Sequence, residues 1–327
     1  MRPLDPSLLP FWLSQTMYGE SVAFIARQDG TAEASLLFPP DAVVAVTSAS
    51  ADVAFVEGID YAVDRAAGRI VRVEGSRMPV TSREALAAAD GALTHDRTVA
   101  VTYTHESDAL GWRPPDFGGS LPRVAQLLYR REPLTISLSG DSISEGYDAS
   151  GFHGIAPHQP GFGRLVADAL EQQRGAPVYL RNLAKAGSTS ADALCDTGRI
   201  AAAKPDLVIV AFGMNDACYA EASDFGANVS MLMQRVRDEA SDAEFVVVSP
   251  MLPTPNCSWL VAARFEEYRA ALAALTGEGV VLADITGLWT RMVERKDPHD
   301  LSGNGLNHPN DFGHRLYAQT IVAAISA

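Results

Sequence analysis

The chain has 327 residues, of which 47% are hydrophobic and 20% are charged, and its formal net charge is −14. This length is sufficient for one large domain or two ordinary ones, and the composition excludes a disordered or fibrous protein. The acidic balance, with no cluster of Lys or Arg, would repel a phosphate backbone, so we expect no nucleic-acid partner.

The first residues, MRPLDPSLLPFWLSQTM, lack a basic segment followed by an apolar run and a small-residue cleavage site, so no signal peptide is predicted. No run of about 18 apolar residues occurs, and we expect neither a membrane span nor a membrane partner. The expected location is therefore the cytoplasm. Cys195, Cys218 and Cys257 are widely spread and lack metal-ligand spacing, so we predict reduced thiols and no metal site.

From about residue 20 to residue 106, short apolar runs are separated by turn residues. Within RTVAVTYT, the residues Val99, Val101 and Tyr103 alternate with Thr and Ala, which is the two-residue period of a half-buried strand. DYAVDRAAGRIVRV predicts a hairpin with Gly68 in its turn. We therefore predict an N-terminal domain, residues 1–130, that holds an all-β, jelly-roll-like sandwich and ends in a linker at about residues 107–130.

After the Gly- and Pro-rich segment GWRPPDFGGSLP the pattern changes. Five apolar runs are separated by stretches of helical length: LTISLSG (134–140), PVYLRNL (177–183), DLVIVAFG (206–213), EFVVVSP (244–250) and GVVLADI (279–285). Continuous apolar strands that alternate with helices indicate a parallel sheet covered on both faces. The last segment, NDFGHRLYAQTIVAAIS, predicts a closing helix capped by Asn310. Residues 131–327 are therefore predicted to form a doubly wound α/β domain.

Polar residues follow the predicted strands, at the edge where open parallel sheets bind their ligands. Ser142 follows the first strand, Gly187 lies beyond the second, Asn215 follows the third, and His308 precedes the closing helix. A serine hydroxyl needs a neighbouring base to become a nucleophile, and His308 can supply that base and later protonate the leaving alcohol. The backbone N–H groups of Ser142 and Gly187 and the side-chain amide of Asn215 can stabilise an oxyanion.

The blocks GDSIS, NLAKAG, GMND and HP, the last before a terminal helix, resemble the SGNH/GDSL hydrolase superfamily in content and in order. The resemblance covers roughly residues 134–327. It implies a flavodoxin-like α/β/α fold with Ser142 as nucleophile and His308 as base. It also implies that Gly187 and Asn215 donate to the oxyanion beside the Ser142 amide. Members are esterases, lipases, thioesterases and carbohydrate deacetylases that use no cofactor.

One position departs from the family pattern, which places an aspartate three residues before the histidine, where it orients the imidazole. Here that residue is Gly305. We favour a Ser–His dyad in which a backbone carbonyl of the 304–306 turn bonds the second nitrogen of His308. That arrangement resembles some two-domain carbohydrate esterases of the superfamily. The alternative is a carboxylate from Asp300, Asp297 or Asp284.

The loop after the serine, SEGYDASGFHGIAPHQPGFG, contains His153 and His158, which are candidate substrate contacts together with Trp259 after the fourth strand. Asp141 and Asp216 are predicted to accept hydrogen bonds from loop amides rather than to act in catalysis.

The leading hypothesis is a serine esterase that releases a short acyl group, such as an O-acetyl group of a carbohydrate, through an acyl-serine intermediate. The alternatives are an acyltransferase that uses the same serine and a non-catalytic glycan-binding protein that has lost the family's aspartate. The expected partner is a small ester or an acylated carbohydrate.

Overall fold

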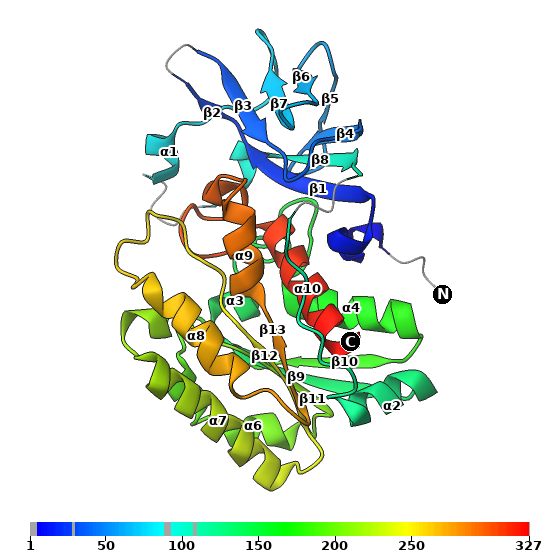
Figure 1. Ribbon diagram of the computed structural model, residues 1–327, viewed down its shortest axis with the longest axis vertical. Coiled ribbons are helices and arrows are strands. Elements are labelled where there is room, and N and C mark those ends of the chain that lie inside the picture. Colours follow the sequence, from blue (N-terminus) through cyan, green and yellow to red (C-terminus); the bar gives the residue numbers. More distant parts are fainter. Residues whose placement is uncertain (1–4, 28–29, 88–92, 107–109, 327) are drawn as a thin grey trace.

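The computed structural model describes residues 5–27, 30–87, 93–106 and 110–326. Figure 1 shows a strand-rich N-terminal part above a larger part in which helices surround a sheet. The last strand of the N-terminal part, β8, ends at Thr104, and the first strand of the larger part, β9, begins at Leu134. The two parts therefore follow one another along the chain.

The N-terminal part contains two four-stranded antiparallel sheets, with the strand orders β1-β8-β4-β5 and β2-β3-β7-β6. In β8 the side chains of Val99, Val101 and Tyr103 are buried, because successive side chains of a strand point to opposite faces. The predicted β-sandwich is confirmed. Its strands are β1 (Thr16–Ala23), β2 (Ile25–Ala26), β3 (Ala32–Ser35), β4 (Ala42–Ser48), β5 (Ala54–Phe55), β6 (Tyr61–Asp64), β7 (Arg69–Arg72) and β8 (Thr98–Thr104).

The predicted hairpin is the pair β6 and β7. The two strands are in register from Tyr61 opposite Arg72 to Asp64 opposite Arg69. Gly68 lies in the turn between them with a φ of +64°.

The larger part contains one five-stranded sheet in which all pairs are parallel, with the order β10-β9-β11-β12-β13. This is the flavodoxin-like strand order. Every residue of the inner strands β11 and β12 is buried, because helices cover both faces of the sheet. The predicted α/β/α domain is confirmed. Its strands are β9 (Leu134–Gly140), β10 (Val178–Asn182), β11 (Leu207–Ala211), β12 (Glu244–Val248) and β13 (Val280–Ala283).

Helices α4 and α10 pack together on one face of this sheet, whereas α6, α7 and α8 lie on the other (Figure 1). The predicted cap of the closing helix is confirmed, since Asn310 Oδ1 accepts a hydrogen bond of 3.0 Å from the Gly313 N–H. The helices are α1 (Arg83–Ala87), α2 (Pro122–Arg130), α3 (Ser142–Glu145), α4 (Phe162–Arg174), α5 (Ser190–Ala193), α6 (Thr197–Ala202), α7 (Ala222–Glu239), α8 (Ala263–Ala273), α9 (Ile285–Val293) and α10 (Asp311–Ser326). Short 3-10 helices span Pro6–Leu8, Phe11–Leu13, His95–Arg97, Asp216–Cys218 and Pro298–Asp300.

A buried ion cluster joins the two parts. Lys296, which follows α9, lies 2.5 Å from Glu20 Oε1 of β1 and 3.3 Å from Asp300 Oδ2. The Tyr103 hydroxyl donates a 2.6 Å hydrogen bond to the other oxygen of Glu20. Removal of Lys296 would leave buried carboxylates without their positive partner, at a cost of about 3–5 kcal/mol. The cluster therefore fixes β1 against the segment that leads to His308.

Helices long and apolar enough to cross a membrane are absent from the described ranges.

Candidate active site

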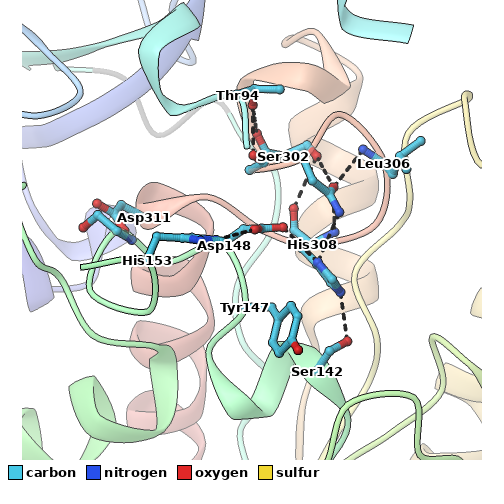
Figure 2. A network of polar contacts seen from close by, with 12 residues as sticks. Thr94, Ser142, Tyr147, Asp148, His153, Ser302, Leu306, His308 and Asp311 are labelled. Atoms are coloured by element: carbon cyan, nitrogen blue, oxygen red, sulfur yellow. Dashed lines mark hydrogen bonds and ion pairs between the residues drawn. The ribbon is translucent and has the colours of Figure 1, made fainter. Parts of the chain in front are cut away.

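Ser142 lies at the start of the short helix α3, which follows strand β9. Asp141 caps this helix, because its Oδ1 accepts a hydrogen bond of 3.0 Å from the Ile143 N–H. Ser142 Oγ lies 2.8 Å from Nε2 of His308 (Figure 2). The two residues that the sequence pairs as nucleophile and base are therefore in hydrogen-bond contact across 166 positions of the chain.

Gly187 and Asn215 come from the loops that follow β10 and β11, the two strands beside β9. The Asn215 side-chain Nδ2 donates a 2.9 Å hydrogen bond to the carbonyl of Ser188, the residue after Gly187. The second N–H of this amide remains for another acceptor. Among the residues that the structure describes, none accepts a hydrogen bond from the backbone N–H of Ser142 or of Gly187. Three donors are thus available at these neighbouring strand ends.

Two buried aspartates fix the loops that carry these donors. Asp216 accepts hydrogen bonds of 2.9 Å from the N–H and 2.5 Å from the Oγ of Ser190, which ties the loop after β10 to the loop after β11. Burial raises the pKa of Asp216 and raises the pKa of Asp141 to about 7. Their predicted role as acceptors for loop amides is confirmed.

His308 is held by the turn that precedes α10. Asn304 organises this turn, since its Oδ1 accepts hydrogen bonds from the N–H groups of Leu306 and Asn307 at 2.9 and 3.1 Å. The ring of Tyr147 lies beside the imidazole, with the ring centroids 5.4 Å apart. The His308 side chain is 13% exposed, so substrate can reach it while most of the ring is covered.

A buried carboxylate faces the other nitrogen of this histidine. Oδ2 of Asp148 lies 2.9 Å from Nδ1 of His308, and its Oδ1 lies 2.8 Å from Nε2 of His153 (Figure 2). Burial would raise the pKa of Asp148, but the hydrogen bonds and charge of the two histidines outweigh burial and hold the pKa below its usual value. Asp148 therefore remains a carboxylate at neutral pH.

The sequence does not single out Asp148. This residue lies in the loop SEGYDASG, after the serine, whereas the family pattern expects an acid shortly before the histidine. A signal was present, because this loop carries a carboxylate between the proposed nucleophile and His153. Only the fold shows that this carboxylate turns toward His308.

The predicted partner of Nδ1, a backbone carbonyl of the 304–306 turn, is wrong. The carbonyl of Gly305 accepts a hydrogen bond of 2.7 Å from Thr254 Oγ1, and the carbonyl of Leu306 accepts one of 2.7 Å from the Thr254 N–H. Both carbonyls are bonded to the loop after β12, and the groups that contact Nδ1 are the side chains of Asp148 and Asn304.

The alternative acids are wrong as well. Asp300 belongs to the buried cluster with Lys296, where burial raises the pKa of Asp300 to about 6. Asp297 Oδ1 lies 2.7 Å from Nδ1 of a different histidine, His299. Asp284 caps helix α9. All three carboxylates are engaged elsewhere.

The three candidate substrate contacts lie in different surroundings. His153 bonds Asp148, on the side of that carboxylate away from His308. His158 is exposed, and Trp259 is 55% exposed. Contact of these side chains with substrate stays a prediction.

The sequence profile of the GDSL-like Lipase/Acylhydrolase family matches residues 138–316. The chain belongs to this family. The match covers more than half of the chain and includes Ser142, Gly187, Asn215 and His308. The protein is therefore a carboxylic ester hydrolase of the GDSL-like family.

Several solved structures are similar to this chain. A two-domain esterase (CEX) active on acetylated mannans has 20% sequence identity and a TM-score of 0.50, over 63% of this chain and 52% of its own. The acetylxylan esterase Axe2 from Geobacillus stearothermophilus has 17% identity and a TM-score of 0.49, over 59% of this chain and 94% of its own. The lipase Lip_vut3 from a goat rumen metagenome has 17% identity and a TM-score of 0.48, over 58% of this chain and 97% of its own. No curated protein sequence matches the chain.

Proposed function

We propose that the protein is a serine esterase that removes short acyl groups, in particular O-acetyl groups of carbohydrates, through an acyl-serine intermediate. The observation that carries this proposal is the 2.8 Å contact between Ser142 Oγ and His308 Nε2. In the described residues, the N–H groups of Ser142 and Gly187, which follow the neighbouring strands β9 and β10, have no acceptor. A serine and a histidine that were paired only for structure would not need such donors.

In the acylation step, Ser142 Oγ attacks the ester carbonyl carbon while His308 Nε2 takes the hydroxyl proton. The carbonyl oxygen becomes an oxyanion, which accepts hydrogen bonds from the N–H groups of Ser142 and Gly187 and from the Asn215 amide. When the tetrahedral intermediate collapses, the bond to the alcohol oxygen breaks, and that oxygen receives the proton from His308. The alcohol leaves and the acyl group remains on Oγ.

In the deacylation step, His308 takes a proton from a water molecule, and the oxygen of this water attacks the acyl carbon. The same donors stabilise the second oxyanion. Its collapse releases the carboxylic acid and returns the proton from His308 to Ser142 Oγ. Each turnover therefore consumes one ester and one water.

Two further features support a carbohydrate ester as the substrate class. Phe152 is 43% exposed and its ring lies 4.3 Å from the ring of Tyr147, which adjoins His308. Such half-exposed rings can cover the apolar face of a bound molecule. The two-domain esterase with a similar fold acts on acetylated mannans.

We propose the same two-domain organisation here, residues 1–130 and 131–327, with helix α2 of the linker packed on β9 and α10.

The experiment is hydrolysis of 4-nitrophenyl acetate by the native protein and by Ser142→Ala. We expect the substitution to lower kcat by about 10⁴-fold or more, because the nucleophile is lost. Release of acetate from acetylated xylan and mannan oligosaccharides tests whether the alcohol of the substrate is a carbohydrate. Equal rates of 4-nitrophenyl acetate hydrolysis by the native protein and by Ser142→Ala would contradict the proposal. Preferential transfer of the acyl group to an added sugar would indicate an acyltransferase, and glycan binding without ester cleavage would indicate a binding protein.

A further inference from the structure

We infer that Asp148 is the positioning carboxylate of this site, and that it orients His308 from the loop after the nucleophile rather than from the turn before the histidine. The inference deepens the proposed function and rests on it. Ser142, His308 and Asp148 lie in one chain of hydrogen bonds of 2.8 and 2.9 Å. Figure 2 shows the imidazole between the hydroxyl and the carboxylate.

The hydrogen-bonding capacity of the imidazole leaves Asp148 as the acceptor. When the Ser142 hydroxyl donates to Nε2, a neutral His308 carries its proton on Nδ1. Two side chains lie near Nδ1, which are Asp148 Oδ2 at 2.9 Å and Asn304 Nδ2 at 3.1 Å. The Asn304 oxygen already accepts from backbone N–H groups of its own turn, so its nitrogen is the atom that faces the ring. An amide nitrogen is a donor and cannot accept the Nδ1 proton.

The position at which the family usually carries the acid, Gly305 in this chain, has no room for an aspartate. Gly305 has a φ of +71°, and a Cβ there would lie 2.9 Å from the backbone oxygen of Leu86 in helix α1. An aspartate at this position would be strained in its backbone and would collide with the N-terminal part. The N-terminal part also holds Gly303, two positions earlier, because the Thr94 N–H donates a 2.7 Å hydrogen bond to its carbonyl.

Asp148 is instead held in a position that suits an acceptor. Its φ is +63°, a conformation that aspartate and asparagine adopt more readily than most residues. The carbonyl before it accepts a hydrogen bond of 3.0 Å from His314 Nε2, and the Ser150 N–H donates one of 2.8 Å to Asp311. Gly303 leaves room for the carboxylate, since a Cβ at that position would lie 2.6 Å from Asp148 Cβ.

His153 occupies the second oxygen of the carboxylate. Its Nε2 lies 2.8 Å from Oδ1, so both oxygens of Asp148 have histidine partners, and the carboxylate cannot rotate away from His308 without losing one. The titratable groups that face Asp148 are His308 and His153, with His314 and Asp311 behind them. We assign His153 a supporting role, as a donor that fixes the carboxylate.

The experiment is Asp148→Asn, which keeps the shape of the side chain and suits the left-handed backbone. We expect kcat for 4-nitrophenyl acetate to fall by about 10²–10⁴-fold, because the amide cannot stabilise the imidazolium, while KM stays close to native and Tm falls modestly with the loss of the buried charge. The acidic limb of the kcat/KM profile should also move to lower pH, since the imidazolium loses its negative partner. A purely structural role for Asp148 would lower Tm but leave kcat of the folded protein and its pH profile in place.

The matched control is Asp297→Asn, which removes a carboxylate from the other Asp–His contact, Asp297 with His299 at 2.7 Å. It should keep native kcat. Native kcat in Asp148→Asn, or an equal loss in both variants, would overturn the inference. If Ser142→Ala is inactive but Asp148→Asn is fully active, the inference alone fails; if Ser142→Ala is active, the proposed function fails.

If Asp148→Asn does not fold, proton NMR of the native protein decides. The inference predicts a far-downfield imidazole N–H resonance at low pH that disappears in His308→Gln. Its absence from the folded native protein would overturn the assignment of Asp148.

Discussion

The loop that carries Ser142 and the turn that carries His308 meet at a hydrogen bond of 2.8 Å, but different parts of the chain hold them. Ser142, Gly187 and Asn215 each follow a strand of one parallel sheet, so the sheet topology alone brings them to one edge. The histidine turn depends on contacts with other segments. The Thr94 N–H and Thr254 Oγ1 bond its carbonyls, from the N-terminal part and from the loop after β12.

This difference teaches that the sheet topology accounts for the residues at the strand ends, whereas the partner of His308 depends on loop contacts that the sequence pattern does not show. The N-terminal part also supports the site, although it does not contact the reacting atoms. β1 carries Glu20, whose buried contact with Lys296 anchors the segment before the histidine turn. We therefore expect substitutions of the oxyanion donors at the strand ends to lower kcat alone. Substitutions around the histidine turn should lower both kcat and stability.

The largest effect that would sharpen this comparison is expected from Asn215→Ala. Loss of an oxyanion donor should lower kcat by about 10²–10³-fold with little change in KM, because the donor acts on charge that develops in the transition state. Steady-state kinetics with 4-nitrophenyl acetate measure it. Gln234→Ala, which removes an exposed amide bonded to Asp238 on α7, is the control and should keep native kcat. A rise in KM with native kcat would show that Asn215 binds substrate instead.

A smaller effect on both rate and stability is expected from Thr94→Val. The Thr94 hydroxyl is buried and donates to the carbonyls of Ser302 and Gly303 at 3.3 and 3.1 Å. Its loss should cost about 0.5–1.5 kcal/mol of the free energy of unfolding. A looser histidine turn should lower kcat by about 2- to 10-fold.

Thermal unfolding and kinetics of this variant are compared with those of Thr276→Val. That control removes an exposed hydroxyl bonded to the carbonyl of Ala273, at the end of α8. It should leave kcat unchanged. If Thr94→Val also leaves kcat unchanged, the N-terminal part does not support the histidine turn.

The smallest effect is expected from His153→Ala and should be a loss of stability at neutral pH that disappears in acid. The pKa of Asp148 lies below its usual value, so this carboxylate stabilises the fold above the ordinary aspartate pKa, and the stabilisation is lost as the pH falls through the lowered value. Removal of His153 takes away one of the interactions that lower this pKa. We therefore expect the Tm of the variant to lie slightly below that of the native protein at neutral pH, and the two Tm values to converge as the pH falls through the lowered pKa. Superimposable pH profiles would contradict the contact.

Much of the fold follows from the sequence, because its strands are apolar runs with clear periods. The predicted first strand of the sheet, LTISLSG, coincides with β9 from Leu134 to Gly140. The pairing of Ser142 with His308 follows from the motif order. The acid could not be predicted. Asp148 reaches His308 because its own backbone is in the left-handed region and because Gly303 leaves space for its side chain. Neither condition has a periodic signature.

The central claim is that Ser142 is a nucleophile that His308 activates. Its most direct test is reaction of the native protein with a fluorophosphonate probe, followed by mass spectrometry of the peptides. The account predicts one adduct, on the peptide and at the hydroxyl of Ser142, and a greatly slowed reaction in His308→Ala. An adduct at another residue, or equal labelling of the native protein and His308→Ala, would contradict it.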